Sequence, residues 1–262
     1  ISWTDHTFNI AWGCIRVSPG CQRCYAETLA KRLGFDVWGP KQTTGRRTFG
    51  ASHWAEPIAW DRRAAAAGRQ AKVFCSSMAD IFEDHPAIDQ EREKLWPLIR
   101  ATPQLTWQLL TKRADRIAEC LPADWGTGYP NVWLGTSVEN QEMADARLPE
   151  LARIPAAVRF ASVEPLLGPV DLRKWIGFIR PEGWCSRCGY DMHGKDHRAW
   201  KHPCPQSLLS WVIVGGESGP GYRPCKPEWI ADVVRQCQAM DVACWVKQDH
   251  GRVSGMQGRI PD

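Results

Sequence analysis

The chain has 262 residues, of which 44% are hydrophobic and 24% charged, so it is long enough for one α/β barrel with a small insertion. It contains no apolar run of about 18 residues and no basic segment followed by an apolar core at its start. These features predict a cytoplasmic protein without a membrane span. The net charge of +4 permits a nucleic-acid partner but does not require one.

The β-rich and helical segments alternate along the chain. Strands are expected at residues 7–12, 72–76, 106–111, 131–136, 158–162, 211–215 and 243–247, and helices at residues 25–33, 89–101, 114–120, 141–153 and 227–240. This alternation predicts an α/β fold whose parallel strands are joined by right-handed crossovers. Six or seven such units favour a partial (β/α) barrel, with a doubly wound open sheet as the alternative.

Two segments interrupt the alternation. Residues 34–60 are rich in glycine and basic residues and are expected to form a long loop. Residues 176–210 are expected to form a small inserted metal-binding module. The partial barrel would then comprise residues 1–175 and 211–262.

Charged residues follow the predicted C-terminal ends of several strands, which is where barrel proteins carry their active sites. They are Asp80, Lys112, Glu139, Glu164, Glu217 and Lys247. We expect most of them to line one pocket, although each could also form an ordinary ion pair at the barrel mouth.

The chain has eleven cysteines, and their clustering indicates metal binding rather than disulfides. Cys14, Cys21 and Cys24 lie together on the loop that follows the first predicted strand. Three thiolates on a [4Fe–4S] cluster leave one iron open for a substrate or cofactor. A structural zinc site normally has four protein ligands, so zinc would need His6 or a distant residue as the fourth. We therefore favour the cluster.

These cysteines, followed directly by the aromatic Tyr25, resemble the motif of the radical S-adenosylmethionine superfamily. The spacing here is six residues and then two, whereas the commonest spacing in the superfamily is three and then two. Residues 3–9, 20–27, 110–113, 135–140, 163–168 and 214–221 are similar to a family common in phages and actinobacteria, known as phage three-Cys-motif proteins of unknown function. That family resembles spore photoproduct lyase in architecture.

The resemblance implies a radical mechanism. A cluster on the three cysteines, reduced by an external donor of flavodoxin or ferredoxin type, would cleave S-adenosylmethionine. The resulting 5′-deoxyadenosyl radical would remove a hydrogen atom from the substrate. Cys75 and Tyr25 are candidate hydrogen-atom donors, with ordinary packing as the alternative for both.

The resemblance also implies a binding role for each of the residues at the strand ends, according to its position. Contacts with the methionyl amine are assigned to Ser76, Ser77 and Asp80. Contacts with the ribose hydroxyls are assigned to Ser137 and Glu139. Close approach of the backbone to the cofactor is assigned to Gly215 and Gly216. The residues left for the substrate are Glu164, Glu217, Lys112 and Lys247.

A second group of metal-binding residue types lies in the predicted insertion. Cys185, Cys188 and Cys204 with one histidine, for which we select His202, would make a zinc site that supplies the folding energy of the module. A second iron–sulfur cluster is the alternative.

Three functions are compatible with these features. The favoured one is a radical enzyme acting on nucleic acid, most directly on thymine in DNA, because fifteen tryptophans, basic segments and the architecture all suit a flipped base. It would repair a photolesion or remodel a modified thymine, as a lyase or an isomerase, and is expected to be monomeric. The alternatives are a radical enzyme acting on a small metabolite or peptide, and a non-catalytic zinc-dependent nucleic-acid-binding protein.

Overall fold

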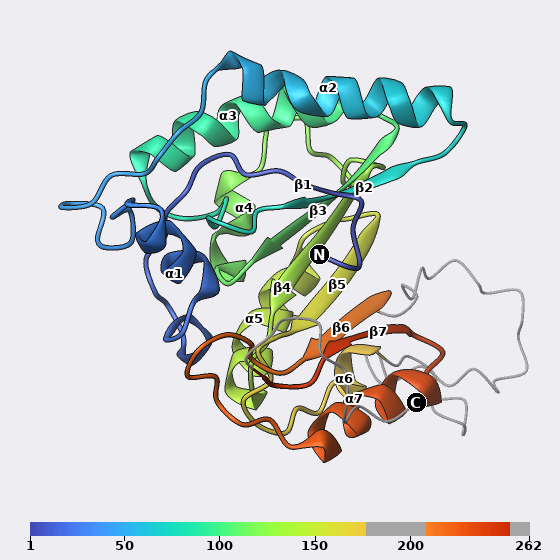
Figure 1. The fold of residues 1–262 in the computed structure, drawn as a ribbon. Helices are drawn as coiled ribbons and strands as arrows, with labels where there is room; N and C mark the ends of the chain where they lie inside the picture. Colours follow the sequence, from blue (N-terminus) through green and yellow to red (C-terminus); the bar gives the residue numbers. More distant parts are fainter. Residues whose placement is uncertain (177–207, 252–262) are drawn as a thin grey trace, which may run out of the picture.

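A computed structural model describes residues 1–176 and 208–251 (Figure 1). Its strands form one parallel sheet in which each strand pairs with the next one in the chain. They are β1 (His6–Thr7), β2 (Ala71–Cys75), β3 (Leu105–Thr111), β4 (Val132–Ser137), β5 (Val158–Val163), β6 (Trp211–Gly215) and β7 (Ala243–Gln248). The sheet curls into a half-barrel, which confirms the predicted α/β partial barrel over the doubly wound sheet.

Helices cover the outer face of this sheet (Figure 1). The described helices are α1 (Tyr25–Arg32), α2 (Ala51–Ala66), α3 (Pro86–Ala101), α4 (Ile117–Cys120), α5 (Gln141–Arg153), α6 (Arg173–Ile176) and α7 (Pro227–Ala239), with the short 3₁₀ turns η1 (Pro19–Cys21) and η2 (Ala114–Arg116). Among them, α1 lies at the strand ends and not over the outer face of the sheet. No helix among the described residues is long and apolar enough to cross a membrane.

Two helices, α3 and α5, begin where a side chain accepts a hydrogen bond from their first turn. The Asn140 side chain accepts a hydrogen bond from the backbone N of Met143 at the start of α5, over 2.9 Å. The ring of His85 does the same for Ala87 in α3, where Pro86 occupies the first helical position. The α5 start lies directly after the end of β4, so this cap helps to set the direction in which the chain leaves the sheet.

Aromatic side chains fill the inside of the half-barrel. Trp3 lies edge-on to Phe74 and Trp211, with ring centroids 4.7 and 5.7 Å apart. Phe160 from β5 packs beside Trp211 and is fully buried. Gly135 of β4 leaves room for it, because a Cβ there would lie 2.5 Å from the Phe160 ring. Much of the tryptophan excess therefore serves packing.

The expected loop at residues 34–60 is wrong in its second half, because α2 begins at Ala51. Trp54, Ile58 and Trp60 pack against the core from this helix. Pro57 lies inside α2 and interrupts the usual helical signal in the sequence.

The first strand is shorter than the predicted 7–12. Beyond Thr7, the side chain of Asn9 accepts a hydrogen bond from the backbone N of Met78 over 2.7 Å. The chain then makes only isolated bridges, such as Gly13 with Ala79. More residues therefore separate the end of β1 from Cys14 than the sequence predicts.

The predicted zinc ligands Cys185, Cys188, His202 and Cys204 lie outside the described residues, so this site and the boundaries of the insertion stay predictions. The sheet is continuous across this part of the chain, because β5 and β6 pair directly, with Phe160 opposite Trp211.

Candidate active site

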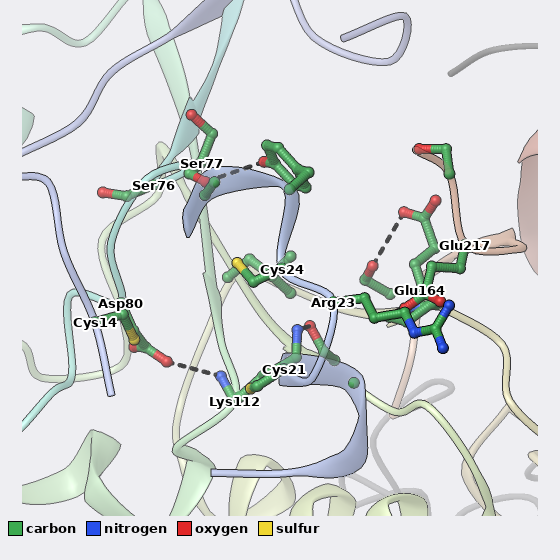
Figure 2. Close-up of a pocket in the computed structure, with 18 of the residues that line it drawn as sticks. Cys14, Cys21, Arg23, Cys24, Ser76, Ser77, Asp80, Lys112, Glu164 and Glu217 are labelled. Atoms are coloured by element: carbon green, nitrogen blue, oxygen red, sulfur yellow. Dashed lines mark hydrogen bonds between the residues drawn. The ribbon is translucent and has the colours of Figure 1, made fainter. Parts of the chain in front are cut away.

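A pocket of about 680 Å³ lies at the C-terminal ends of the strands (Figure 2). Five of the six charged residues expected at one pocket line it, namely Asp80, Lys112, Glu164, Glu217 and Lys247. Glu139 does not line it. The three cysteines of the first loop line the same pocket.

The cysteine loop connects β1 to α1. Cys14 follows the bridge between Gly13 and Ala79, Cys21 ends η1, and Cys24 is the N-cap residue of α1. All three residues are partly buried, and their thiols form no disulfides. Burial raises the pKa of the Cys14 thiol to about 12, and the nearby Arg113 opposes this only in part. Burial also raises the pKa of Cys24, although the N–H groups of the α1 N-terminus oppose it.

The three thiols match the donor set of an iron–sulfur cluster in type and number. Among residues 1–176 and 208–251, no group of three or more His, Cys, Asp or Glu side chains is arranged to hold one ion. In a [4Fe–4S] cluster each cysteine binds a different iron, so the sulfurs need not converge on one point. Three soft sulfur donors facing one pocket are the donor set that such a cluster takes.

Asp80 is anchored within the protein. It is buried, and it accepts hydrogen bonds from Thr111 Oγ1 over 2.7 Å, from the backbone N of Lys112 over 3.0 Å and from Arg113 Nη1 over 2.9 Å. Burial by itself would raise the pKa of Asp80, but Arg113 and these hydrogen bonds outweigh it and hold the pKa below its usual range. Asp80 thus joins the ends of β2 and β3.

Glu139 supports the cysteine loop by contacting Ser18 and Gly20. It is fully buried and accepts hydrogen bonds from Ser18 Oγ over 2.6 Å and from Arg147 Nη1 over 2.8 Å. Gly20 packs directly on it, because a Cβ at Gly20 would lie 2.4 Å from Glu139 Oε1. Nearby, Lys112 Nζ donates to Ser137 Oγ over 3.1 Å, and Ser137 itself lines the pocket.

The remaining carboxylates at the pocket are paired with cations. Lys247 Nζ lies 3.1 Å from Glu164 Oε1. Arg223 donates to Glu217 through its backbone N, its Nε and its Nη2. Both carboxylates line the pocket with their charges largely balanced.

Hydroxyl groups and glycines occupy the other predicted positions. Ser76 and Ser77 line the pocket, and the Tyr25 hydroxyl donates to the Ser77 carbonyl over 3.0 Å (Figure 2). Gly216 also lines it, and a Cβ there would lie 2.6 Å from the backbone N of His250. Gly215 and the fully buried Cys75 are not among the lining residues.

Several lining residues were not predicted from the sequence. They are the aromatic residues Trp3, Trp38 and Phe74 and the cations Arg16, Arg23 and Arg113. Arg113 stands next to the predicted Lys112 after β3, so its position at a strand end was the available signal. Trp3 carries no such signal, because it reaches the pocket from the N-terminal segment.

The protein is an α/β half-barrel with a cysteine-bearing pocket at the C-terminal ends of its strands. Residues 1–258 match a family described as a protein of unknown function, DUF5131, and the chain belongs to that family. No curated protein matches the sequence.

Solved structures of spore photoproduct lyase share the fold. The structure complexed with dinucleoside spore photoproduct has a TM-score of 0.50 at 15% identity, covering 92% of this chain and 75% of that one. A variant with bound AdoMet and the same dinucleoside gives the same values. A further variant reaches 0.51 at 15% identity, covering 94% and 77%. At this identity the likeness establishes the fold alone.

Proposed function

We propose that this protein is a radical S-adenosylmethionine enzyme that holds a [4Fe–4S] cluster on Cys14, Cys21 and Cys24. The observation that carries the proposal is the placement of three disulfide-free thiols on one loop, facing a pocket at the C-terminal mouth of a half-barrel. Once bound and reduced by an external one-electron donor, the cluster would supply reductive activation of S-adenosylmethionine for hydrogen-atom removal.

The protein's own residues would bind and orient this chemistry. Ser76, Ser77 and Ser137 present hydroxyls for the polar groups of the cofactor, and Gly216 brings its backbone to the pocket wall. The buried Asp80 and Glu139 would act through their neighbours by fixing the strand ends and the cysteine loop. Tyr25 is the better placed of the two candidate hydrogen-atom donors, because it lines the pocket whereas Cys75 does not.

We further propose that the substrate is a thymine in DNA. Trp3, Tyr25, Trp38 and Phe74 line the pocket, and aromatic rings can stack on an extruded base. Two of the similar spore photoproduct lyase structures hold a dinucleoside spore photoproduct, which supports a similar substrate here. Recognition of an amine metabolite is less well supported, because Glu164 and Glu217 already have cationic partners.

Anaerobic reconstitution with iron and sulfide tests the cluster. The unsubstituted chain should bind about four iron atoms and give the electron paramagnetic resonance signal of a reduced cluster. Cys14→Ala, Cys21→Ala and Cys24→Ala should each lose most of the iron. Cys120→Ala is the matched control, because this buried cysteine lies in α4 and does not line the pocket. Full iron content in all the loop variants would refute the cluster assignment.

Mass spectrometry of DNA after anaerobic reaction tests the substrate. UV-irradiated DNA and DNA with modified thymines are each incubated with protein, reductant and S-adenosylmethionine. Conversion of a thymine lesion or a modified thymine is the expected result. An active cluster that alters neither DNA, but consumes the cofactor with a small metabolite or peptide, would overturn the DNA assignment and leave the radical mechanism standing.

A further inference from the structure

We propose that Arg113 is a positioning residue that sets the reduction potential of the cluster through a hydrogen bond to the sulfur of Cys14. This inference rests on the proposed function, since it concerns the cluster that Cys14, Cys21 and Cys24 would hold. The resemblance assigned no role to Arg113, although this residue stands next to Lys112 after β3.

Arg113 links the cysteine loop to the end of β3. Its Nη1 donates to Cys14 Sγ over 3.5 Å, within the reach of a hydrogen bond to sulfur, and to Asp80 Oδ2 over 2.9 Å. Its Nη2 donates to the carbonyl of Ile15 over 2.8 Å. The guanidinium therefore contacts both the first ligand and the backbone directly after it.

This contact is made away from bulk water. Arg113 is only 6% exposed, and the Nη1 that faces Cys14 is also paired with the buried Asp80. Glu83 lies 3.6 Å from Arg113 Nη2 and is itself bound by the buried Arg46 over 2.9 Å. Glu83 also accepts a hydrogen bond from the backbone N of Ile15 over 2.8 Å. Two cations and two carboxylates thus form a balanced, buried network behind Cys14.

The direction of the effect follows from the charges. A cluster that gains an electron becomes more negative, and hydrogen bonds to its sulfurs and nearby positive charge favour that state. Burial keeps the interaction from being screened by water. Removing the charge of Arg113 would leave Asp80 and Glu83 with Arg46 alone, so the reduction potential should fall.

Redox titration of the reconstituted holoprotein, followed by electron paramagnetic resonance, tests this. Arg113→Gln should make one-electron reduction about tenfold less favourable, which corresponds to a potential about 59 mV more negative. Arg113→Lys keeps the positive charge but loses the two guanidinium nitrogens that donate side by side. It should therefore shift the potential in the same direction by a smaller amount. Arg92→Gln is the matched control, because Arg92 is also 6% exposed and bound to Asp89 and the Ile81 carbonyl. Its potential should equal that of the unsubstituted protein.

The outcomes separate this inference from the proposed function. If the unsubstituted protein binds no cluster, both fall. If it binds a cluster and the Arg113 variants have the same reduction potential as the unsubstituted protein, the proposed function stands and the tuning role is wrong. Loss of the cluster from both Arg113 variants would assign the residue a purely structural role and would also overturn the inference.

Discussion

Asp80 and Glu139 lie at the strand ends where the sequence places them, but their partners come from distant segments. Ser18 and Glu139 are 121 residues apart, and Asp80 and Arg113 are 33 apart. Residue type and position after a strand identify which side chains gather at the barrel mouth. They do not show which of these charges pair with one another, because pairing depends on how the cysteine loop folds back onto the sheet.

Gly20 is a residue whose replacement should disturb the cluster site without touching a thiol. A methyl group there would lie 2.4 Å from Glu139 Oε1, so the loop that carries Cys21 has to move. We expect Gly20→Ala to retain much less iron after reconstitution. Gly45→Ala is the control, because a Cβ at Gly45 meets nothing within 4 Å. Equal iron contents in the two variants would show that this contact does not position the loop.

The Asp80–Arg113 pair should make stability depend on pH. The pKa of Asp80 is depressed in the folded protein. Its contribution is therefore complete above the unfolded value of about 3.9 and is lost as the pH falls through the folded value. Asp80→Asn should lower the free energy of unfolding by about 3 kcal/mol at neutral pH, measured by urea denaturation.

The difference between Asp80→Asn and the unsubstituted protein should shrink below about pH 4. Asp115→Asn, at an exposed aspartate in η2, should change the stability little at any pH. A difference for Asp80→Asn that stays constant down to the acid transition would argue against the ion pair as its source.

At the scale of elements, the central strands could be predicted closely and the N-terminal region could not. β2 to β7 are apolar runs bounded by polar residues, and each lies within two residues of its predicted limits. The whole of α2, the sixteen residues from Ala51 to Ala66, was missed as helix because Pro57 and the preceding glycines indicate a loop. The early end of β1 was not predicted. Beyond Thr7, the backbone N–H of Met78 donates to the side chain of Asn9 and not to a strand partner.

Among the helix caps near the site, Asn140 at the start of α5 should be the one whose replacement lowers the free energy of unfolding most. Asn140 accepts from the backbone N of Met143 and directly follows Glu139. We expect Asn140→Ala to lower the free energy of unfolding by about 1 kcal/mol, and Asn140→Asp to keep most of it, in urea denaturation. If both variants lose the same amount, the cap hydrogen bond does not stabilise the helix.

At the scale of the whole molecule, the half-barrel opens its pocket on the side that carries Arg16, Arg23 and Lys112. Binding of DNA through at least two phosphates should weaken about tenfold when salt rises from about 50 to 200 mM, as measured by fluorescence anisotropy. In the same titration, the charge-reversal variant Arg23→Glu should bind DNA more weakly at low salt, and its affinity should fall less steeply as salt rises. An affinity that does not respond to salt would count against DNA as the partner.

Release of 5′-deoxyadenosine tests the central claim most directly. The reconstituted protein is reduced anaerobically with S-adenosylmethionine, and the nucleoside is quantified by mass spectrometry beside Cys24→Ala and Cys120→Ala. The radical mechanism predicts 5′-deoxyadenosine from the unsubstituted protein and from Cys120→Ala, and none from Cys24→Ala. A cluster-loaded, reducible protein that binds S-adenosylmethionine and releases no 5′-deoxyadenosine, with or without DNA, would contradict it.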